Sequence, residues 1–455
     1  MPDFSGKKVL VLGLGESGKA SAALLRAAGA IARVSESSAG PGMELKKKEL
    51  QDLGIDIEIG ANTSAFCAGA ELVVTSPGVD IKALRERGVI ERDVPVIGEL
   101  ELGYLFCKAP IVAVTGTNGK STTCRLIGNM LTEAGVHNIV CGNIGNPLSG
   151  EVDKLGDKSV AVVEVSSYQL ETIKDFQPYI ALLLNITEDH YDRHVNMEQY
   201  RVAKFRIFMN QSGADWAIMN GSMREDPLLS GVKAKVRFFG REGDGVAIHG
   251  RDVHILTKGL ADAVIKGEDM PMSGEHNLEN VASSAMVCQI LGVDSGAIIK
   301  GVKSFHPLEH RFQTVATYGG VDFIDDSKAT NIDATARALG SLDKKVVLIA
   351  GGRDKGGDYA AIKGLVGDKV SAFVLIGEAA QRISGTFEKT VPCYFARDMA
   401  DAVSRSATLA RPGEVVMLSP MCSSFDMYKN YKERGLDFRK AVDTVTRIPV
   451  TKGGV

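Results

Sequence analysis

Short apolar runs rich in Val and Ile recur along the chain, and each is followed by a glycine-marked turn and a helical pattern of apolar positions. This order of run, turn and helix predicts strands of parallel α/β sheets. The runs fall into three groups. They occupy residues 7–15, 30–37 and 71–79, then 109–116, 159–167, 178–187 and 214–220, and finally 344–352, 371–377 and 414–420.

The three groups predict an α/β protein of three domains. We expect a Rossmann-like N-terminal domain over residues 1–98, a central domain with a parallel sheet of the P-loop ATPase type over 99–307, and a Rossmann-like C-terminal domain over 308–455. The length agrees with this division, because 455 residues are too many for one ordinary hydrophobic core.

Composition narrows the class of partner and the compartment. A formal net charge of −3 gives no electrostatic reason to expect nucleic acid or an anionic membrane as a partner. The seven cysteines lack the CxxC and CxxH spacings of zinc sites, and their odd number argues against a disulfide framework. No apolar segment is long enough to span a bilayer, and the N-terminal run lacks a signal-peptide pattern, so we expect a soluble cytoplasmic protein.

The first glycine-rich segment, GLGESG at 13–18, matches the dinucleotide-binding fingerprint. In that fingerprint an acid about 20 residues later binds the ribose hydroxyls, and Glu36 at the end of the next predicted strand has that place. NAD binding is therefore one interpretation of the segment. The other is that its glycines only allow the first helix to pack closely on its strand.

A stronger nucleotide signal lies at 111–131, where a buried strand, a glycine-containing loop and an amphipathic helix follow one another. Such loops bind phosphate because backbone N–H groups of the loop and of the helix N-terminus converge on the anion. Lys120 is expected to reach the β- and γ-phosphates, and the Ser121 hydroxyl to ligate Mg²⁺. The loop is a variant, because Val114 occupies the place of the usual first glycine and the glycine of this chain is Gly116.

Polar residues follow two predicted strands of the second group. Glu164 lies near the end of the run 159–167, and Glu188, Asp189 and His190 follow the run 178–187. Because ligands of open α/β sheets bind beyond the carboxyl ends of the strands, both segments can bring metal ligands to the phosphate loop. Mg²⁺ prefers oxygen ligands, which favours Glu164 and makes His190 a less usual candidate.

The segment 197–210 predicts a helix with Tyr200, Lys204 and Phe208 on one line. A lysine between two aromatic residues on a helix is usually a surface residue whose amine reaches water. From the helical pattern alone, Lys204 has no evident role.

Seven short motifs follow one another in the order VTGTNGKST, VVEVSSYQL, LNITEDHYDRH, YRVAKFRIF, GEHNLEN, HRFQ and DDSKATN. With these motifs the whole chain resembles the Mur ligases, ATP-dependent enzymes that build the peptide of the bacterial cell-wall precursor. DDSKATN at 325–331 and the segment 419–435 are most similar to the branch of the family that adds D-glutamate.

The resemblance implies a reaction in two steps. The terminal carboxylate of UDP-N-acetylmuramoyl-L-alanine (UDP-MurNAc-L-Ala) attacks the γ-phosphorus of ATP, and the amine of D-glutamate then captures the acyl phosphate. The implied cofactors, besides ATP, are two Mg²⁺ ions and a CO₂-derived carbamate on the Lys204 amine. The implied partners are these small-molecule substrates, and we expect a monomer whose N-terminal segment binds UDP instead of NAD.

The resemblance also assigns residues to each ligand. ATP is expected on Gly116, Thr117, Asn118, Gly119, Lys120, Ser121 and Thr122, with Asn280 at the adenine, Arg311 at the phosphates and Asp326 at the ribose. The metal ions are expected on Ser121 and Glu164 and on His190 with carbamylated Lys204, so Lys120, Glu164, His190 and Lys204 form the catalytic set. The UDP-sugar is expected on Gly15, Glu16, Ser17, Glu36, Ser37, Ser76, Pro77, Gly78 and Asn143, and D-glutamate on Lys328, Thr330, Lys355, Ser424 and Tyr431.

Other interpretations stay open. An NAD-dependent oxidoreductase would use the first glycine-rich segment but leaves GTNGKST unexplained. A nucleotide-gated switch would bind ATP and a UDP-sugar without joining substrates. A sister ligase that adds lysine or diaminopimelate keeps the chemistry, although Lys328 and Lys355 would repel an extra amino group. A ligase like the folylpolyglutamate synthases shares the central and C-terminal plan but is not expected to begin with GLGESG.

Overall fold

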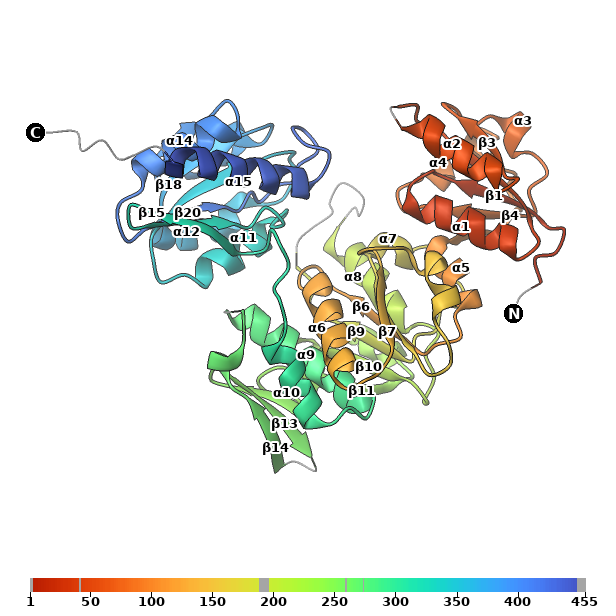
Figure 1. Cartoon of the computed structure of the whole chain (residues 1–455), viewed down its shortest axis with the longest axis horizontal. Helices are drawn as coiled ribbons and strands as arrows, with labels where there is room; N and C mark the ends of the chain where they lie inside the picture. Colours follow the sequence, from red (N-terminus) through yellow and green to blue (C-terminus); the bar gives the residue numbers. More distant parts are fainter. Residues whose placement is uncertain (1–2, 41, 188–195, 258–259, 273, 448–455) are drawn as a thin grey trace, which may run out of the picture. The chain divides into compact units, whose positions relative to one another are not determined.

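The computed structural model describes residues 3–40, 42–187, 196–257, 260–272 and 274–447 (Figure 1). The chain forms two compact units. The first comprises residues 1–185, 200–270 and 279–305, and the second comprises 186–199, 271–278 and 306–455.

The first unit begins with a parallel five-stranded sheet in the order β3-β2-β1-β4-β5. The strands are β1 (Lys8–Leu12), β2 (Ile31–Glu36), β3 (Asp56–Ile59), β4 (Leu72–Thr75) and β5 (Val96–Gly98), and the helices are α1 (Glu16–Ala27), α2 (Met43–Asp52), α3 (Ser64–Cys67) and α4 (Ile81–Glu86). The strand order reverses between β1 and β4, so the segments that follow these two strands lie side by side. Ligands of open α/β sheets bind at such a switch point.

A second parallel sheet of six strands follows in the order β11-β10-β9-β6-β8-β7. The strands are β6 (Ile111–Thr115), β7 (Asn138–Gly142), β8 (Val160–Glu164), β9 (Ile180–Leu183), β10 (Trp216–Asn220) and β11 (Lys235–Phe239). Helices of this part are α5 (Glu99–Phe106), α6 (Lys120–Glu133), α7 (Ser167–Leu170), α8 (Met197–Phe205), α9 (Glu275–Ile290) and α10 (Ser295–Lys303). All residues of β6 and β8 are buried, which explains their unbroken apolar runs.

A small antiparallel sheet completes the first unit. It consists of β12 (Val246–His249), β13 (Asp252–Thr257) and β14 (Leu260–Ile265), with β13 in the middle. The sequence patterns did not predict these strands. Their segments, VAIH, DVHILT and LADAVI, mix polar and apolar residues and contain no long apolar run.

The second unit contains one six-stranded sheet in the order β15-β16-β20-β17-β18-β19, in which only the edge strand β15 is antiparallel. The strands are β15 (Gln313–Tyr318), β16 (Val321–Asp325), β17 (Val346–Gly351), β18 (Val370–Ile376), β19 (Cys393–Phe395) and β20 (Val415–Leu418). The helices are α11 (Ile332–Gly340), α12 (Lys363–Lys369), α13 (Ala380–Phe387), α14 (Met399–Leu409) and α15 (Tyr431–Arg447), with α14 and α15 on one face of the sheet and α11 and α12 on the other (Figure 1).

Strand β17 shows why the apolar runs of this chain do not alternate with polar residues. Val346 and Leu348 pack into the core under α11, α12 and α13. Val347 and Ile349 point to the opposite face and pack against α14 and α15. Because helices cover both faces, every position of the strand is buried and apolar.

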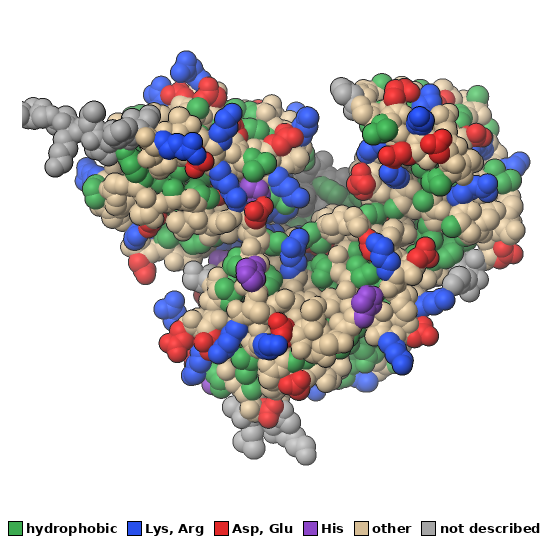
Figure 2. Space-filling view, in the orientation of Figure 1, with side chains coloured by type: hydrophobic (Ala, Val, Ile, Leu, Met, Phe, Trp, Pro, Cys, Tyr) green, Lys and Arg blue, Asp and Glu red, His purple; other side chains and the backbone are tan. Residues whose placement is uncertain are grey.

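The predicted α/β architecture is confirmed, because each of the ten predicted runs overlaps one parallel strand of these sheets. The domain boundaries at 98/99 and 307/308 stay predictions. None of the helices in the described ranges is long and apolar enough to cross a membrane. Lys and Arg side chains are interspersed with Asp and Glu side chains on the face shown in Figure 2.

Candidate functional site

Lys120 shapes the loop between β6 and α6. Its Nζ donates to the backbone oxygens of Gly116 (2.7 Å) and Thr117 (2.8 Å). Gly119, at the N-cap of α6, has a φ of 88° and offers no side chain to cap the helix. The loop therefore combines a lysine with an uncapped helix N-terminus, which are the two features of a phosphate site.

Asn185, two residues after the end of β9, fixes the middle of this loop. Its Oδ1 accepts a hydrogen bond from Asn118 N (2.8 Å), and its Nδ2 donates to Asn118 O (3.1 Å). Its backbone oxygen accepts from Thr117 N (3.0 Å). Sequence reasoning missed Asn185. The available signal was a polar residue at the end of a buried strand, but the pairing of β9 with β6 is a tertiary fact.

Glu164 ends β8 on the other side of β6 and is 3% exposed. Its Oε1 accepts a hydrogen bond from Asn143 Nδ2 (2.8 Å), whereas Oε2 is buried and has no hydrogen-bond partner within the part of the chain that the structure describes. A buried carboxylate oxygen without a partner is costly, so the arrangement fits an oxygen ligand of a cation. Asn143, expected at the UDP-sugar, is thus in direct contact with the expected metal ligand.

Lys204 is buried, with 1% of its surface exposed, and the interpretation as a surface lysine is wrong. Its Nζ donates to the Gly116 backbone oxygen (3.0 Å) and lies 4.4 Å from the centre of the Tyr200 ring. The Tyr200 hydroxyl lies 3.3 Å from Thr117 Oγ1. Helix α8 therefore brings the side chains of Tyr200 and Lys204 to the phosphate loop, because the side of the helix that carries them faces the protein interior.

Asn280 of α9, expected at the adenine, lies beside the start of α6. Its Oδ1 accepts a hydrogen bond from Thr123 Oγ1 (3.2 Å). A Cβ on Gly119 would lie only 2.4 Å from this oxygen. Glycine at 119 therefore allows Asn280 to approach the N-terminus of α6 closely. Ser121 and Thr122, in the first turn of α6, are buried.

The glycines of the first loop have different structural reasons. A Cβ on Gly18 would lie 1.9 Å from Gly13 O, and one on Gly13 would lie 2.8 Å from Ser76 Oγ. A Cβ on Gly15 would meet no atom within 4 Å. Close packing therefore explains Gly13 and Gly18, and the open space at Gly15 is what close approach of a ligand to the start of α1 requires.

Glu36 closes the same loop from β2. Its Oε2 accepts from Leu14 N (2.8 Å) and its Oε1 from Ser38 N (2.7 Å). Lys46 of α2 donates to Leu14 O (3.2 Å). The sequence predicted that Glu36 binds a ligand, whereas the structure shows that both of its carboxylate oxygens accept hydrogen bonds from backbone N–H groups. Other expected residues of this site, Glu16, Ser37, Pro77 and Gly78, are exposed at the same end of the sheet.

In the second unit, four residues expected to bind D-glutamate follow three adjacent strands. Lys328 and Thr330 follow β16, Ser424 follows β20, and Lys355 follows β17. Because the carboxyl ends of parallel strands meet at one edge, the sheet brings these segments together. Tyr431, at the start of α15, joins them through its ring, whose centre lies 3.9 Å from Lys328 Nζ.

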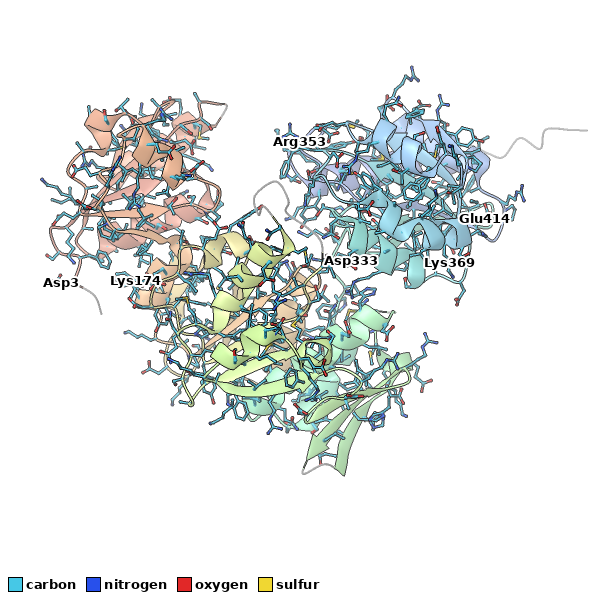
Figure 3. All side chains as sticks on the ribbon, turned by 180° about the vertical axis from the view of Figure 1, so that it is seen from behind. Asp3, Lys174, Asp333, Arg353, Lys369 and Glu414 are labelled. Atoms are coloured by element: carbon cyan, nitrogen blue, oxygen red, sulfur yellow. The ribbon has the colours of Figure 1, made fainter. Side chains whose placement is uncertain are left out.

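The same edge can be followed in Figure 3, where Arg353 marks the carboxyl ends of the strands, with Glu414 and Lys369 at the opposite end. A cavity of about 300 Å³ opens in this unit. Its lining includes Asn331, Ile332, Asp354, Lys355, Tyr359 and Met421. The cavity combines an apolar wall with one amide, one lysine and the carboxylates of Asp333, Asp354 and Asp358.

Asp326, expected at the ribose, is buried with a partner on each oxygen. Oδ1 accepts from Phe312 N (3.2 Å) and Oδ2 from Ser419 Oγ (2.9 Å). Burial raises the pKa of Asp326 to about 7 despite the lowering effect of these bonds. His310 and Phe312, on either side of the predicted phosphate ligand Arg311, have φ values of 64° and 45°, which is a strained conformation for such residues.

The predicted phosphate-loop residues 116–122 and the predicted metal ligand Glu164 lie in the first unit. Arg311, also predicted at the phosphates, lies in the second unit with the predicted ribose and amino-acid residues. His190 lies outside the described residues. Within those residues no group of three or more His, Cys, Asp and Glu side chains forms a metal cluster.

Comparison with known proteins finds similar proteins along most of the chain. Models of the Mur ligase family match three segments: a MurD-like N-terminal domain at 7–98, a Mur ligase middle domain at 114–288, and a Mur ligase, glutamate ligase domain at 310–422. The UDP-N-acetylmuramoylalanine–D-glutamate ligase of Desulfatibacillum aliphaticivorans is 41% identical over 97% of this chain and 99% of its own length. The ligase of the same name from Pelotomaculum thermopropionicum is 38% identical over 97% and 98%. Among solved structures, the MurF ligase of Thermotoga maritima in complex with ADP has a TM-score of 0.60, covers 98% of this chain and 100% of its own, and is 16% identical, so it supports the fold alone.

Proposed function

The chain belongs to the Mur ligase family, and from this membership we propose that it is the ATP-dependent ligase that joins D-glutamate to the L-alanine carboxylate of UDP-MurNAc-L-Ala. The product is a precursor of peptidoglycan. We further propose that the enzyme acts as a cytoplasmic monomer with small-molecule substrates.

One observation carries the proposal. The phosphate loop after β6 is flanked by Glu164 at the end of β8, and a buried oxygen of Glu164 has no hydrogen-bond partner among the described residues. Phosphoryl transfer requires a loop that binds the ATP phosphates and, beside it, a carboxylate that can hold Mg²⁺. Two relatives named for D-glutamate ligation cover nearly the whole chain.

The chemistry requires positive charge, because a carboxylate must attack the γ-phosphorus of an anionic nucleotide. Residues 116–122 are proposed to bind the phosphates, with Lys120 exchanging its bonds to the Gly116 and Thr117 oxygens for bonds to the nucleotide. The resulting acyl phosphate reacts with the D-glutamate amine to form the amide and release phosphate. Arg311 is proposed at the phosphates, Asn280 at the adenine and Asp326 at the ribose.

Ser121 and Glu164 fit a first Mg²⁺, since they supply a hydroxyl and a buried carboxylate oxygen. When bound, Mg²⁺ neutralises phosphate charge during transfer. A second ion is proposed on His190 and on a carbamate of Lys204. The buried Lys204 amine lies at the phosphate loop, and addition of CO₂ with loss of two protons would convert an ammonium cation that repels Mg²⁺ into an anionic carbamate, which is an oxygen ligand.

We propose that the three predicted domains divide the substrates. Residues 1–98 bind the UDP-sugar, with the diphosphate at Gly15, Glu16 and Ser17, the uridine near Glu36 and Ser37, and Ser76, Pro77 and Gly78 along the sugar. Asn143, in the central domain, is proposed as a further contact of the sugar. Support comes from the switch point between β1 and β4 and from the open space at Gly15. Residues 99–307 bind ATP. Residues 308–455 bind D-glutamate through Lys328, Thr330, Lys355, Ser424 and Tyr431, a set of cations and hydroxyls suited to a dicarboxylate.

The test is phosphate release by the purified protein from ATP and Mg²⁺ with UDP-MurNAc-L-Ala, comparing D-glutamate, L-glutamate, L-lysine, diaminopimelate and no amino acid. We expect turnover only with D-glutamate. Turnover with L-lysine or diaminopimelate would show that the protein belongs to a sister branch of the family that adds a diamine. If Lys120→Ala keeps the full response to substrate, the protein is a nucleotide-gated switch and not a ligase.

A further inference from the structure

The loop that carries Lys355 is organised around Asp354. Its Oδ1 accepts hydrogen bonds from Gly356 N (2.9 Å) and from the Tyr359 hydroxyl (3.3 Å), two groups of the same loop and the turn that follows it. These contacts fold the loop back onto the side chain of Asp354. The backbone on both sides of Lys355 is therefore fixed through one carboxylate.

Arg382, on the separate helix α13, binds the same carboxylate. Its Nη1 donates to both oxygens of Asp354, at 2.8 Å and 2.6 Å, and its Nη2 donates to Gly357 O (2.7 Å). One guanidinium thus holds the loop at a residue before Lys355 and at a residue after it. The planar, rigid donor group of arginine suits this double attachment, and the mobile ammonium of lysine does not.

A second connection joins this loop to the segment that carries Ser424. The Tyr359 hydroxyl, which donates to Asp354, lies 3.1 Å from Cys422 Sγ. Arg353 N donates to Ser423 O (2.9 Å). The contacts therefore run from Arg382 through Asp354 and Tyr359 to the neighbouring strand end, and they link two segments proposed to bind D-glutamate.

Both members of the pair are charged near neutral pH. Burial alone would raise the pKa of Asp354. The hydrogen bonds from Arg382, Gly356 and Tyr359 together lower it by more than burial raises it, so the pKa lies below the ordinary value. The hydrogen bond to Asp354 raises the pKa of Arg382. A partly exposed ion pair contributes little to global stability, so the consequence of this geometry is expected mainly in the loop that it holds.

We propose that Arg382 and Asp354 are positioning residues that fix the Lys355 loop in the geometry that binds a carboxylate of D-glutamate. The proposal rests on the proposed function, because it assigns Lys355 to D-glutamate. Neither residue needs to touch a substrate. Without the pair the loop has more conformations, and binding of the amino acid must first select one of them.

The test compares Arg382→Ala with Arg405→Ala. Arg405 is a matched control, because it forms an ion pair with Asp401 at 2.8 Å and the side chains are 48% and 13% exposed, against 45% and 21% for Arg382 and Asp354. That pair lies at the start and middle of α14, away from the Lys355 loop. We expect Arg382→Ala to raise KM for D-glutamate by on the order of ten- to a hundredfold, with KM for ATP and UDP-MurNAc-L-Ala within about twofold of wild type. Arg405→Ala is expected to leave all three KM values unchanged.

Asp354→Asn and Arg382→Lys complete the experiment. Asp354→Asn is expected to raise the same KM, and Arg382→Lys to recover only part of the loss, because a lysine cannot bind both oxygens and Gly357 O together. Equal effects of Arg382→Ala and Arg405→Ala, or a uniform loss for all three substrates, would overturn the proposal. Failure of the wild type to use D-glutamate would instead overturn the proposed function, so the two failures are distinguishable.

Discussion

The Asn143 side-chain amide donates a 2.8 Å hydrogen bond to Oε1 of Glu164, and Asn143 N donates to the Glu164 backbone oxygen at 2.9 Å. Asn143 therefore orients the carboxylate whose other oxygen is buried and finds no hydrogen-bond partner in the described ranges. The resemblance implied a substrate contact for Asn143, and the structure shows a contact with Glu164, which makes a role in orienting this carboxylate a second hypothesis. These two roles make different kinetic predictions.

We expect Asn143→Ala to raise the Mg²⁺ concentration for half-maximal turnover by about ten- to a hundredfold, the usual cost of removing a group that orients a metal ligand. Titration of Mg²⁺ at saturating substrates measures this effect. Asn146→Ala is the matched control, since the side-chain amide of Asn146 donates the same type of hydrogen bond to the carboxylate of Glu151. If Asn143→Ala raises only KM for UDP-MurNAc-L-Ala, its role is at the substrate and not at Glu164.

Gly15→Ala and Gly18→Ala separate ligand binding from packing in the first loop. A methyl group on Gly18 would collide with Gly13 O, so Gly18→Ala is expected to lower the free energy of unfolding by on the order of 1–3 kcal/mol. Gly15→Ala meets only open space and is expected to leave stability unchanged while raising KM for UDP-MurNAc-L-Ala. Urea unfolding and steady-state kinetics measure the two effects. An unchanged KM for UDP-MurNAc-L-Ala in Gly15→Ala would contradict the proposal that this loop binds the diphosphate.

Lys204→Ala is expected to lose turnover by orders of magnitude, and the kind of rescue identifies the lost group. If Lys204 acts as a carbamate, short carboxylates such as formate or acetate should restore part of the activity, because they supply an anionic oxygen ligand. If it acts as an ammonium group, methylammonium should restore activity and formate should not. Phosphate release at increasing concentrations of each additive distinguishes the cases, and rescue by methylammonium alone would contradict the carbamate.

Asp326 predicts a specific dependence of stability on pH. Its pKa is raised by burial to about 7 in the folded protein, above its ordinary value of 3.8. Its contribution to the free energy of unfolding is therefore fully present below 3.8 and is lost as the pH rises through about 7. Relative to Asp326→Asn, the wild type should lose on the order of a few kcal/mol between about pH 4 and pH 8.

Denaturant unfolding of both proteins across this range measures the difference. Asp322→Asn is a control whose difference from the wild type should stay constant across this range, because hydrogen bonds from Lys344 and Thr317 lower the pKa of Asp322 below 3.8. The stability that Asp322 contributes is present above 3.8 and lost as the pH falls. A pH-independent difference between wild type and Asp326→Asn would show that Asp326 is ionised throughout.

The sequence by itself determined the features whose physical cause is local. An apolar run such as IVAVT becomes a buried strand, the glycines after it allow a tight loop, and Lys120 and Ser121 occupy fixed places at the start of the following helix. These properties depend on neighbours within about one turn of the chain, so spacing alone predicts them. The order of the motifs was enough to predict the family.

The tertiary structure decided which distant segments meet. Strand order brings Asn185 and Glu164 to opposite sides of one loop, burial converts Lys204 from an expected surface residue into a contact of Gly116, and packing of α13 places Arg382 on Asp354. No pattern of period 2 or 3.6 encodes these contacts, because periodicity predicts that a side chain faces the interior but not which neighbour it meets there. Shape and hydrogen-bond satisfaction of the packed interior select the partner.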